Sequence, residues 1–336
     1  MAVSLAVSVT AIIPVWNGRD LLMKLLDTLD RQTLPPDEVL IVDNGSEDGA
    51  PEAAERRGAR VIRLGANRGF AFAMNRGAEN CATDHIAILN SDVELDPEWL
   101  RLLLGAKARF ACGTILSASD PTVIDGLFDL LCRGGCPWRA GSGGRETGEP
   151  PQAIDMASFT AIVVERESFL KAGLLDERFE SYLEDVDFGL RCMALGIRGQ
   201  FLPDAICRHH GSAALGRWHG DSVRRMARNQ IFLLAKHYPR TLIRRWWWPI
   251  LVAQGLWGAL AFRHGAGFSW LRGKWEGLRQ FGALPHTPNA GLERTLQNHE
   301  TAVHNMQKKQ GMDWYWRVYF GLVGYKRHSP PARLGP

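Results

Sequence analysis

The chain has 336 residues, of which 46% are apolar and 23% charged, so a folded protein is expected and a largely disordered one is excluded. Its net charge of +4 is unevenly placed: residues 1–215 carry 21 Lys and Arg against 31 Asp and Glu, and residues 216–336 carry 19 against 5. The six cysteines lack the paired CxxC spacing of zinc sites, which leaves free thiols as the expectation. The apolar start has no basic region before it and continues into the first predicted strand, which argues against a signal peptide.

Strands and helices alternate along the first part of the chain. Short apolar runs predict strands at 7–15, 38–42, 59–64 and 85–89, and the segments between them predict helices, as at 18–31 where leucines share one face. This alternation predicts an α/β fold in which a mostly parallel sheet is wound with helices. No GxGxxG follows the first strand and no GxxxxGK(S/T) occurs, which argues against a dinucleotide-dependent dehydrogenase and a P-loop NTPase.

Polar or glycine residues follow every one of these strands. They are Asn17, Asp43-Asn44, Asn67-Arg68 and Asn90-Ser91-Asp92. Parallel strands point the same way, so these groups are expected along one edge of the sheet, where ligands bind in open α/β folds. A carboxylate such as Asp92 can hold a divalent cation there, and through it a diphosphate. The alternative is that Asp92 only ends its strand.

The middle of the chain has weaker patterns. Asp96-Pro97-Glu98 is typical of a helix start, with an N-cap residue followed by proline at the first helical position. Residues 110–152 show no regular periodicity, and 132–151, rich in Gly, Pro and Arg, is either a connector or a lid over substrate. A strand is predicted at 154–164 and a helix at 166–172.

Two clusters of ionisable residues stand out farther along. Glu184, Asp185 and Asp187 open a predicted helix, where each acid is favourable by about 0.3–1 kcal/mol. Three acids preceded by aromatic residues exceed what a helix cap requires. A strand at 201–207 leads to His209-His210, and adjacent histidines at a strand end suit a metal ligand or a phosphate contact.

Taken together, these segments resemble glycosyltransferase family 2, which has the Rossmann-like GT-A fold, and especially its rhamnosyltransferase-like bacterial members. The resemblance covers about residues 7–215 and depends on ordered motifs rather than on any single one. The motifs are VTAIIPVWN at 9–17, VDNGSEDG at 42–49, NRGFAFAMNRG at 67–77, LNSDVEL at 89–95, LDERF at 175–179, EDVD at 184–187 and HH at 209–210.

The resemblance implies a site for a nucleotide-diphosphate sugar and a cation. Asp92 stands at the metal-binding DXD position and would hold Mg²⁺ or Mn²⁺, although the first acid of that motif is Asn90 here. His209 matches a position that completes the metal shell in some relatives, and His210 is the alternative. The implied nucleotide-sugar contacts are Pro14, Val15, Asn17, Asp43, Asn44, Asn67, Arg68, Gly69, Asn90, Ser91 and Asp92.

The resemblance also implies the chemistry. Asp185 would be the catalytic base of an inverting transfer to a hydroxyl of a saccharide or lipid-linked acceptor, and Glu184 could exchange roles with it. The donor would be dTDP-rhamnose or a UDP-sugar, and the setting cell-envelope polysaccharide synthesis. The alternative is a non-catalytic protein that binds nucleotide sugars, which the single carboxylate of the DXD position favours.

The basic, Trp-rich region 216–336 is predicted to be a helical extension of a catalytic domain at 1–215. Residues 246–262 combine tryptophans and aliphatic residues, with arginines on both sides, but are short for a spanning helix. An element lying on an anionic membrane surface is therefore expected, with a helix packed on the catalytic domain or in an oligomer interface as the alternative. Nucleic acid is not an expected partner, and the expected location is cytoplasmic, peripheral on the inner face of the membrane.

Overall fold

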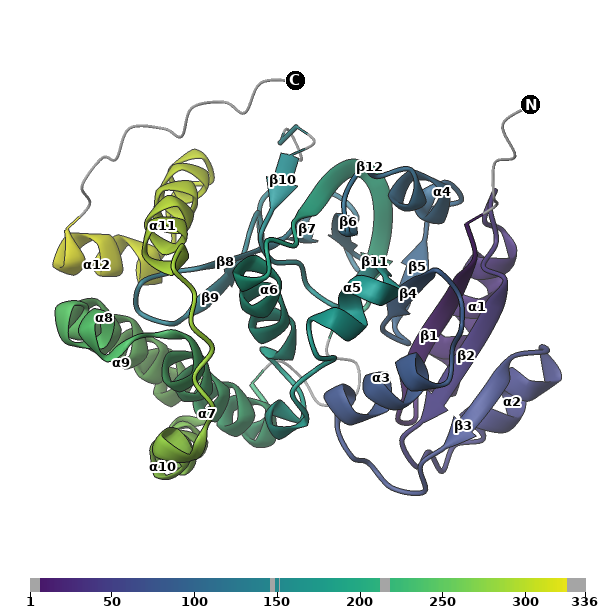
Figure 1. The fold of residues 1–336 in the computed structure, drawn as a ribbon, viewed down its shortest axis with the longest axis horizontal. Helices are drawn as coiled ribbons and strands as arrows, with labels where there is room; N and C mark the ends of the chain where they lie inside the picture. The colour runs from purple at the N-terminus through teal and green to yellow at the C-terminus, as the bar shows by residue number, and fades with distance from the viewer. Residues whose placement is uncertain (1–6, 146–148, 151, 212–217, 325–336) are drawn as a thin grey trace. The chain divides into compact units, whose positions relative to one another are not determined.

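The computed structural model describes residues 7–145, 149–150, 152–211 and 218–324. They form two compact units (Figure 1). Within the described residues, the first unit comprises 7–128 and 142–211, and the second comprises 129–141 and 218–324. The predicted boundary at 215/216 stays a prediction, and the structure assigns the segment 129–141 to the second unit.

One large mixed sheet organises the first unit. Its order is β10-β12-β6-β11-β4-β1-β2-β3, with β1 parallel to β2 and β4, β2 parallel to β3, β6 parallel to β12, and β11 antiparallel to β4 and β6. Two short strands attach outside this path, β5 to β12 and β7 to β6. The strands are β1 (Val9–Val15), β2 (Glu38–Asp43), β3 (Arg60–Arg63), β4 (His85–Leu89), β5 (Val93–Leu95), β6 (Phe110–Ser117), β7 (Ile124–Gly126), β10 (Gln152–Ile154), β11 (Ala161–Glu165) and β12 (Gly199–His209).

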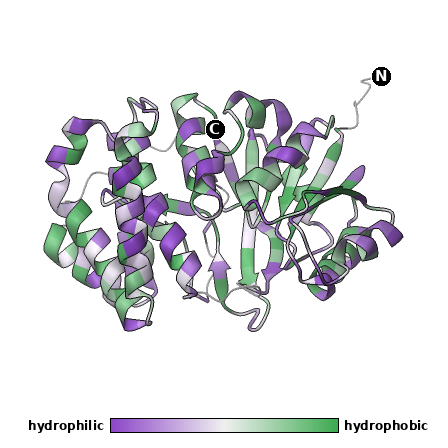
Figure 2. Cartoon of the chain, turned by 90° about the horizontal axis from the view of Figure 1, so that it is seen from below, coloured by the Kyte–Doolittle hydropathy of each residue, from purple (hydrophilic) through white to green (hydrophobic). Residues whose placement is uncertain are grey.

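Helices cover both faces of this sheet, as the alternating pattern predicts. Alternate residues of β1 point to opposite faces, so Ile13 lies in a core cluster with leucines of α1, whereas Ile12 lies against Gly77 of α3. Figure 2 shows the hydrophobic residues concentrated on the central strands. The helices are α1 (Arg19–Asp30), α2 (Ala50–Arg56), α3 (Phe70–Glu79), α4 (Trp99–Leu104), α5 (Arg166–Lys171), the 3₁₀ turn η1 (Glu177–Phe179) and α6 (Glu184–Ala194).

The region predicted to lack regular structure, 110–152, contains a central strand instead. β6 carries small residues in place of a strong apolar pattern, because the carbonyl oxygen of Ala205 passes so close to Gly113 that a Cβ there would lie 1.7 Å from it. Residues 146–148 and 151 of the predicted loop lie outside the described residues. The single strand expected at 154–164 is two strands, β10 and β11.

The helix predicted at Asp96 begins later. α4 starts at Trp99, and the carboxylate of Asp96 forms an ion pair with Arg208 of β12 instead of capping the helix. The prediction was wrong here because the partner of Asp96 lies far away in the sequence.

The second unit is helical. The hairpin of β8 (Asp129–Leu131) and β9 (Pro137–Arg139) packs against α11, where the backbone N–H of Arg133 donates to Glu300 over 2.9 Å. Residues 132–141 are thus part of this unit, and the lid considered from the sequence stays a prediction. All six cysteines are buried free thiols. The helices are α7 (Gly220–His237), α8 (Arg240–Arg245), α9 (Trp247–Arg263), α10 (Gly267–Gln280), η2 (Phe281–Ala283), α11 (Leu292–Lys309) and α12 (Trp314–Val323).

Within the ranges described, none of the helices has both the length and the apolar character needed to cross a membrane.

Candidate active site

The loops after β1 and β2 are joined at the carboxyl edge of the sheet. The backbone N–H of Asn17 donates to Oγ of Ser46 over 2.9 Å, and Oδ1 of Asn17 accepts from the backbone N–H of Glu47 over 2.9 Å. Asn17 makes these contacts from a left-handed conformation, with φ of 60°, which asparagine tolerates better than most residues. Pro14 and Val15 precede it at the end of β1. The sequence prediction that these strand ends gather at one edge is confirmed.

Asp43 and Asn44 are buried at that edge and hydrogen-bond to the backbone of the neighbouring loops. Oδ1 of Asp43 accepts from the backbone N–H of Ser46 over 2.9 Å. Asn44 accepts from the backbone N–H of Arg68 over 3.1 Å and donates to the carbonyl of Gly69 over 3.3 Å. Each of the two side chains is only 4% exposed. Their contacts hold the loops after β2 and β3 in place.

The loop after β3 presents polar and positive groups to solvent. Oδ1 of Asn67 accepts from the backbone N–H of Gly69 over 3.0 Å, which closes a tight turn. The guanidinium of Arg68 lies 3.9 Å from the centre of the Phe72 ring and is exposed. A cation stacked in this way is held near one position and can contact a phosphate.

β5 and β12 bring Asp92 and His209 together. The register pairs Val93 with His209, and the backbone N–H of His210 donates to the carbonyl of Asp92 over 3.0 Å. Nε2 of His209 consequently lies 3.3 Å from Oδ1 of Asp92. His210 points elsewhere and lies 2.7 Å from Glu94. Of the two histidines considered from the sequence, the structure therefore places His209 beside Asp92.

A second carboxylate holds the other side of the His209 ring. Nδ1 of His209 lies 2.9 Å from Oδ2 of Asp125, a residue of β7 that sequence reasoning did not identify. Burial by itself would lower the pKa of His209, but the hydrogen bonds and charges of Asp125 and Asp92 outweigh it and raise the pKa to about 9. No motif marks Asp125, because its partner stands 84 positions away in the sequence.

Asp92 and His209 offer few donor atoms for a metal ion. Among the residues that the structure describes, no group of three or more His, Cys, Asp and Glu side chains is arranged to hold a metal ion. The chain can therefore offer one carboxylate oxygen and one imidazole nitrogen at this point. With Asp125 on Nδ1, the ring is held so that Nε2 faces Asp92, which is how a carboxylate orients a metal-binding histidine. These two groups fit a divalent cation that takes its other ligands from a diphosphate and water.

The segment before Asp185 is strained. Glu180, Tyr182 and Leu183 all have positive φ, of 60°, 73° and 67°. At Glu180, with ψ of −74°, the backbone N–H of Ser181 donates to the carbonyl of Phe179 over 2.7 Å, which makes a γ-turn. Each such conformation costs about 1–3 kcal/mol and persists only where the surroundings enforce it, as at functional sites. The observed strain makes this segment a candidate functional one.

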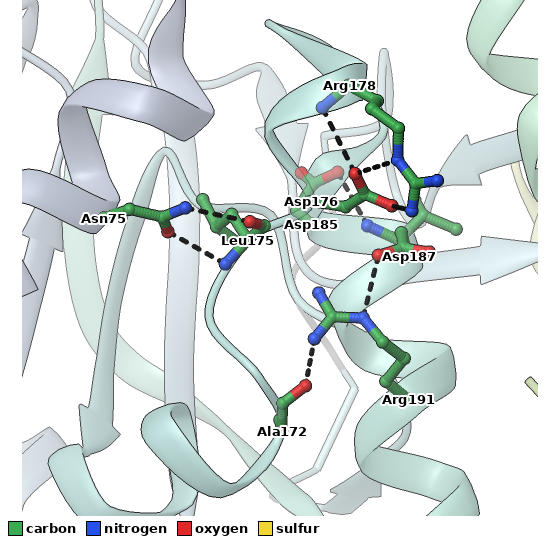
Figure 3. A network of polar contacts seen from close by, with 9 residues as sticks. Asn75, Ala172, Leu175, Asp176, Arg178, Asp185, Asp187 and Arg191 are labelled. Atoms are coloured by element: carbon green, nitrogen blue, oxygen red, sulfur yellow. Dashed lines mark hydrogen bonds and ion pairs between the residues drawn. The ribbon is translucent and has the colours of Figure 1, made fainter. Parts of the chain in front are cut away.

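Polar contacts hold the chain on both sides of that segment (Figure 3). Asn75 of α3 accepts from the backbone N–H of Leu175 over 2.9 Å and donates to its carbonyl over 2.9 Å. Arg191 of α6 pairs with Asp187 over 2.9 Å and donates to the carbonyl of Ala172. Together these contacts tie the loop between α5 and α6 to both α3 and α6. Asn75 was not predicted as important, because a single asparagine within a helical pattern gives no signal of its partner.

Glu184 and Asp185 have different surroundings. Glu184 is 6% exposed, its Oε2 has no hydrogen-bond partner among the described residues, and burial together with the negative charge of Asp185 raises its pKa well above the usual range. Asp185 is only half-buried, and its carboxylate accepts from the backbone N–H groups of Val186, over 2.8 Å, and Phe159, over 3.4 Å. Burial therefore disfavours the charged form of Glu184, whereas the carboxylate of Asp185 is partly exposed and accepts two backbone hydrogen bonds, which makes Asp185 the better candidate for the proton acceptor.

A short segment connects the two halves of the site. Phe159 contacts Asp185, and the next residue, Thr160, accepts from the backbone N–H of Asn90 over 2.9 Å. Asn90 stands two residues before Asp92. Residues 159–160 are therefore hydrogen-bonded to the candidate base on one side and to the segment that leads to Asp92 on the other.

Comparison with known proteins agrees with this architecture. Residues 10–171 match the family described as "Glycosyl transferase family 2". An N-acetylglucosaminyl-diphospho-decaprenol L-rhamnosyltransferase of Mycobacterium tuberculosis is 29% identical over 276 residues, which are 72% of this chain and 87% of that protein. O-antigen biosynthesis protein RfbC of Myxococcus xanthus is 32% identical over 228 residues, which are 61% of this chain and 17% of that protein.

Two solved structures share the fold. GalNAc-T7, crystallised with UDP, GalNAc and Mn²⁺, aligns with a TM-score of 0.59 at 14% identity over 95% of this chain and 57% of that chain. TarS of S. aureus aligns with a TM-score of 0.53 at 15% identity over 93% of this chain and 54% of that chain. This chain thus spans just over half the length of either. Residues 10–171 form a glycosyl transferase family 2 domain, and the chain is a glycosyltransferase of the GT-A fold.

Proposed function

We propose that this glycosyltransferase moves a sugar, with inversion, from a nucleotide-diphosphate donor to a hydroxyl of a lipid-linked saccharide. The observation that carries the proposal is that Asp92 lies beside His209, and that residues 159–160 contact Asp185 on one side and Asn90, two residues before Asp92, on the other. The first pair suits the diphosphate, and Asp185 suits the acceptor hydroxyl.

The residues proposed to bind the donor lie at the carboxyl edge of the sheet. Asn17, Asp43 and Asn44 would frame the nucleotide, and the exposed Asn67 and Arg68 would contact it or its phosphates. Asp92 and His209 would hold Mg²⁺ or Mn²⁺, which when bound would neutralise charge on the departing diphosphate. Arg68, stacked on Phe72, supplies a further positive charge for that purpose.

Asp185 is the residue proposed to act on the acceptor. A sugar hydroxyl ionises far above neutral pH, so its attack on the anomeric carbon needs a carboxylate that accepts the proton. The strained segment before Asp185 and its contact with Phe159 fix where that carboxylate lies. One base opposite the leaving group leads to direct displacement, which inverts the anomeric centre, and no second carboxylate nucleophile is needed.

The choice of substrates rests on the relatives. The mycobacterial relative is named as a rhamnosyltransferase acting on a diphospho-decaprenol-linked sugar, which supports dTDP-rhamnose, with a UDP-sugar as alternative, and a lipid-linked acceptor. Such an acceptor would place the enzyme at the inner face of the cytoplasmic membrane, in the synthesis of a cell-envelope polysaccharide.

A pair of isosteric variants tests the assignment of the base. Asp185→Asn removes the proton acceptor and should lower turnover by about 10²–10⁴-fold while donor binding persists. Glu184→Gln replaces a buried carboxyl, whose charged form is disfavoured, with an uncharged amide of the same shape, and it should keep turnover within about tenfold. Loss of turnover in Glu184→Gln with activity retained in Asp185→Asn would exchange the two roles.

Donor binding is measured separately by thermal shift with UDP-, dTDP- and GDP-sugars, each with and without Mn²⁺. A donor at about 100 times its Kd should stabilise the protein by about 2.7 kcal/mol. No shift with any donor would contradict the proposal. A shift without turnover in the unmodified protein would favour the non-catalytic alternative.

A further inference from the structure

Helix α10 presents its large apolar side chains to solvent. Phe268, Leu271, Trp275 and Leu278 are 84%, 46%, 57% and 62% exposed. Their spacing of three and four residues places them in one stripe along the helix. The residues that α10 buries are Gly267, Gly273, Lys274 and Gly277. The helix is thus amphipathic in the reverse of the usual sense, with apolar residues outside.

Close packing against α7 fixes this orientation. A Cβ at Gly273 would lie 2.1 Å from the carbonyl oxygen of Arg224, and one at Gly277 would lie 2.7 Å from Cβ of Ile231. Lys274, between these glycines, donates to Gln230 over 2.7 Å and also to Gln254. Turning the stripe toward the interior would break these hydrogen bonds and force larger side chains into a backbone contact, so the stripe stays on the surface.

Two exposed arginines flank the stripe. Arg272 and Arg279 are exposed on the same helix, and the guanidinium of Arg279 lies 4.5 Å from the centre of the Trp275 ring. The acid of α10, Glu276, is paired with Arg224 and Arg272. Over residues 218–324 as a whole, the chain has fifteen Lys and Arg against five Asp and Glu.

The apolar surface extends to the end of α9. Phe262 is 51% exposed, and its ring centre lies 6.4 Å from that of Phe268. The run 246–262 that the sequence suggested as the membrane element is divided: Val252, Ala253 and Ala261 are buried, whereas Trp247 and Leu251 are 61% and 57% exposed.

We infer that this surface, made of Phe262, Phe268, Leu271, Trp275 and Leu278 with the flanking Arg272 and Arg279, docks on an anionic phospholipid bilayer. Aromatic and aliphatic side chains beside arginines are the composition of elements that lie in the headgroup region. A second copy of the chain would bring the same positive charges together, which disfavours self-association through this face. The inference deepens the proposed function, since a lipid-linked acceptor gives the contact its purpose, but the binding itself requires no catalysis.

Vesicle flotation of the full chain tests the inference. Vesicles of equal parts phosphatidylglycerol and phosphatidylcholine should carry the protein upward, phosphatidylcholine alone should not, and high salt should release it. The double variant Trp275→Ser/Leu278→Ser should bind the anionic vesicles about tenfold more weakly or worse, because two large apolar groups no longer leave water. The matched control Leu34→Ser/Leu195→Ser removes two exposed leucines of the first unit, 42% and 47% exposed, and should bind as the parent does.

Retained vesicle binding in Trp275→Ser/Leu278→Ser, or no binding by the parent chain, would overturn the inference. A dimer in light scattering that this variant dissociates would instead assign the face to a second copy. The thermal shift with a donor sugar is recorded on the same samples and should be the same in all of them. Failure of membrane docking and failure of the proposed transferase function are therefore separately visible.

Discussion

The start of α3 allows a sharp test of how the site is held. Gly69 has φ of 87° and ψ of 166°, and a Cβ at this position would lie 2.7 Å from the carbonyl oxygen of Glu180. The same carbonyl accepts from the backbone N–H of Ala71 over 2.9 Å. Gly69→Ala should therefore destabilise the first unit and displace the strained segment that leads to Asp185.

The size of the effect follows by comparison with Gly49. Gly49 also precedes a helix and has a positive φ, of 77°, but no atom lies within 4 Å of a Cβ built there. Gly49→Ala should therefore lower the free energy of unfolding only by the cost of a left-handed conformation for a residue with a Cβ, about 1–2 kcal/mol. Gly69→Ala adds a clash with a backbone atom that cannot rotate away, which raises the cost to roughly 3 kcal/mol or more. At about 2–4 °C per kcal/mol for a unit of this size, Tm should fall by about 6–12 °C.

Calorimetric unfolding of both variants, with kcat and KM measured beside it, decides the question. Gly69→Ala should lower Tm well below that of Gly49→Ala and should lower kcat, since Glu180 moves and Asp185 follows it in the chain. Equal losses of Tm in the two variants would refute the reasoning, because the close approach to Glu180 would then have no energetic consequence.

Two pH-dependent effects follow from buried groups. In the metal-free protein, the pKa of His209 is raised to about 9, so the stability that its charged form contributes is complete below pH 6.5 and is lost as the pH rises through 9. Asp125→Asn should lower the pKa of His209 in an NMR titration. An unchanged pKa would show that Asp125 does not raise it. Burial lowers the pKa of Lys274 from 10.5 to about 7, so burying this lysine costs nothing above pH 10.5, and the cost grows as the pH falls to 7. Lys274→Met should remove this slope of about 1.4 kcal/mol per pH unit, seen in urea unfolding at several pH values, and an identical slope in the variant would contradict it.

Local patterns predicted the first half of the sheet well. The central strand was placed at His85–Leu89 and observed there, and the strands before it differ from prediction only at their ends. These elements have strong apolar periods and turn residues between them, so each can be recognised without its neighbours. The edge at which their polar ends meet follows from parallel pairing alone.

Prediction failed where distant partners decide the structure. β6 has little pattern of its own, because Gly113 must admit the backbone of β12. Asp125 and Asn75 matter through contacts with His209 and Leu175, which lie 84 and 100 positions away. The exposure of the apolar stripe of α10 likewise depends on a distant partner, since its glycines pack on α7.

The two halves of the proposed site are connected through the main chain. Asn44, at the end of β2, holds the backbone at Arg68 and Gly69, and Gly69 in turn lies against the carbonyl of Glu180. From Glu180 the strained segment leads directly to Asp185. Main-chain atoms have far less conformational freedom than long side chains, so this path fixes the position of the base relative to the donor loops. The strain at 180–183 is therefore best understood as the energetic cost of that alignment, which the contacts of α3 and α6 offset.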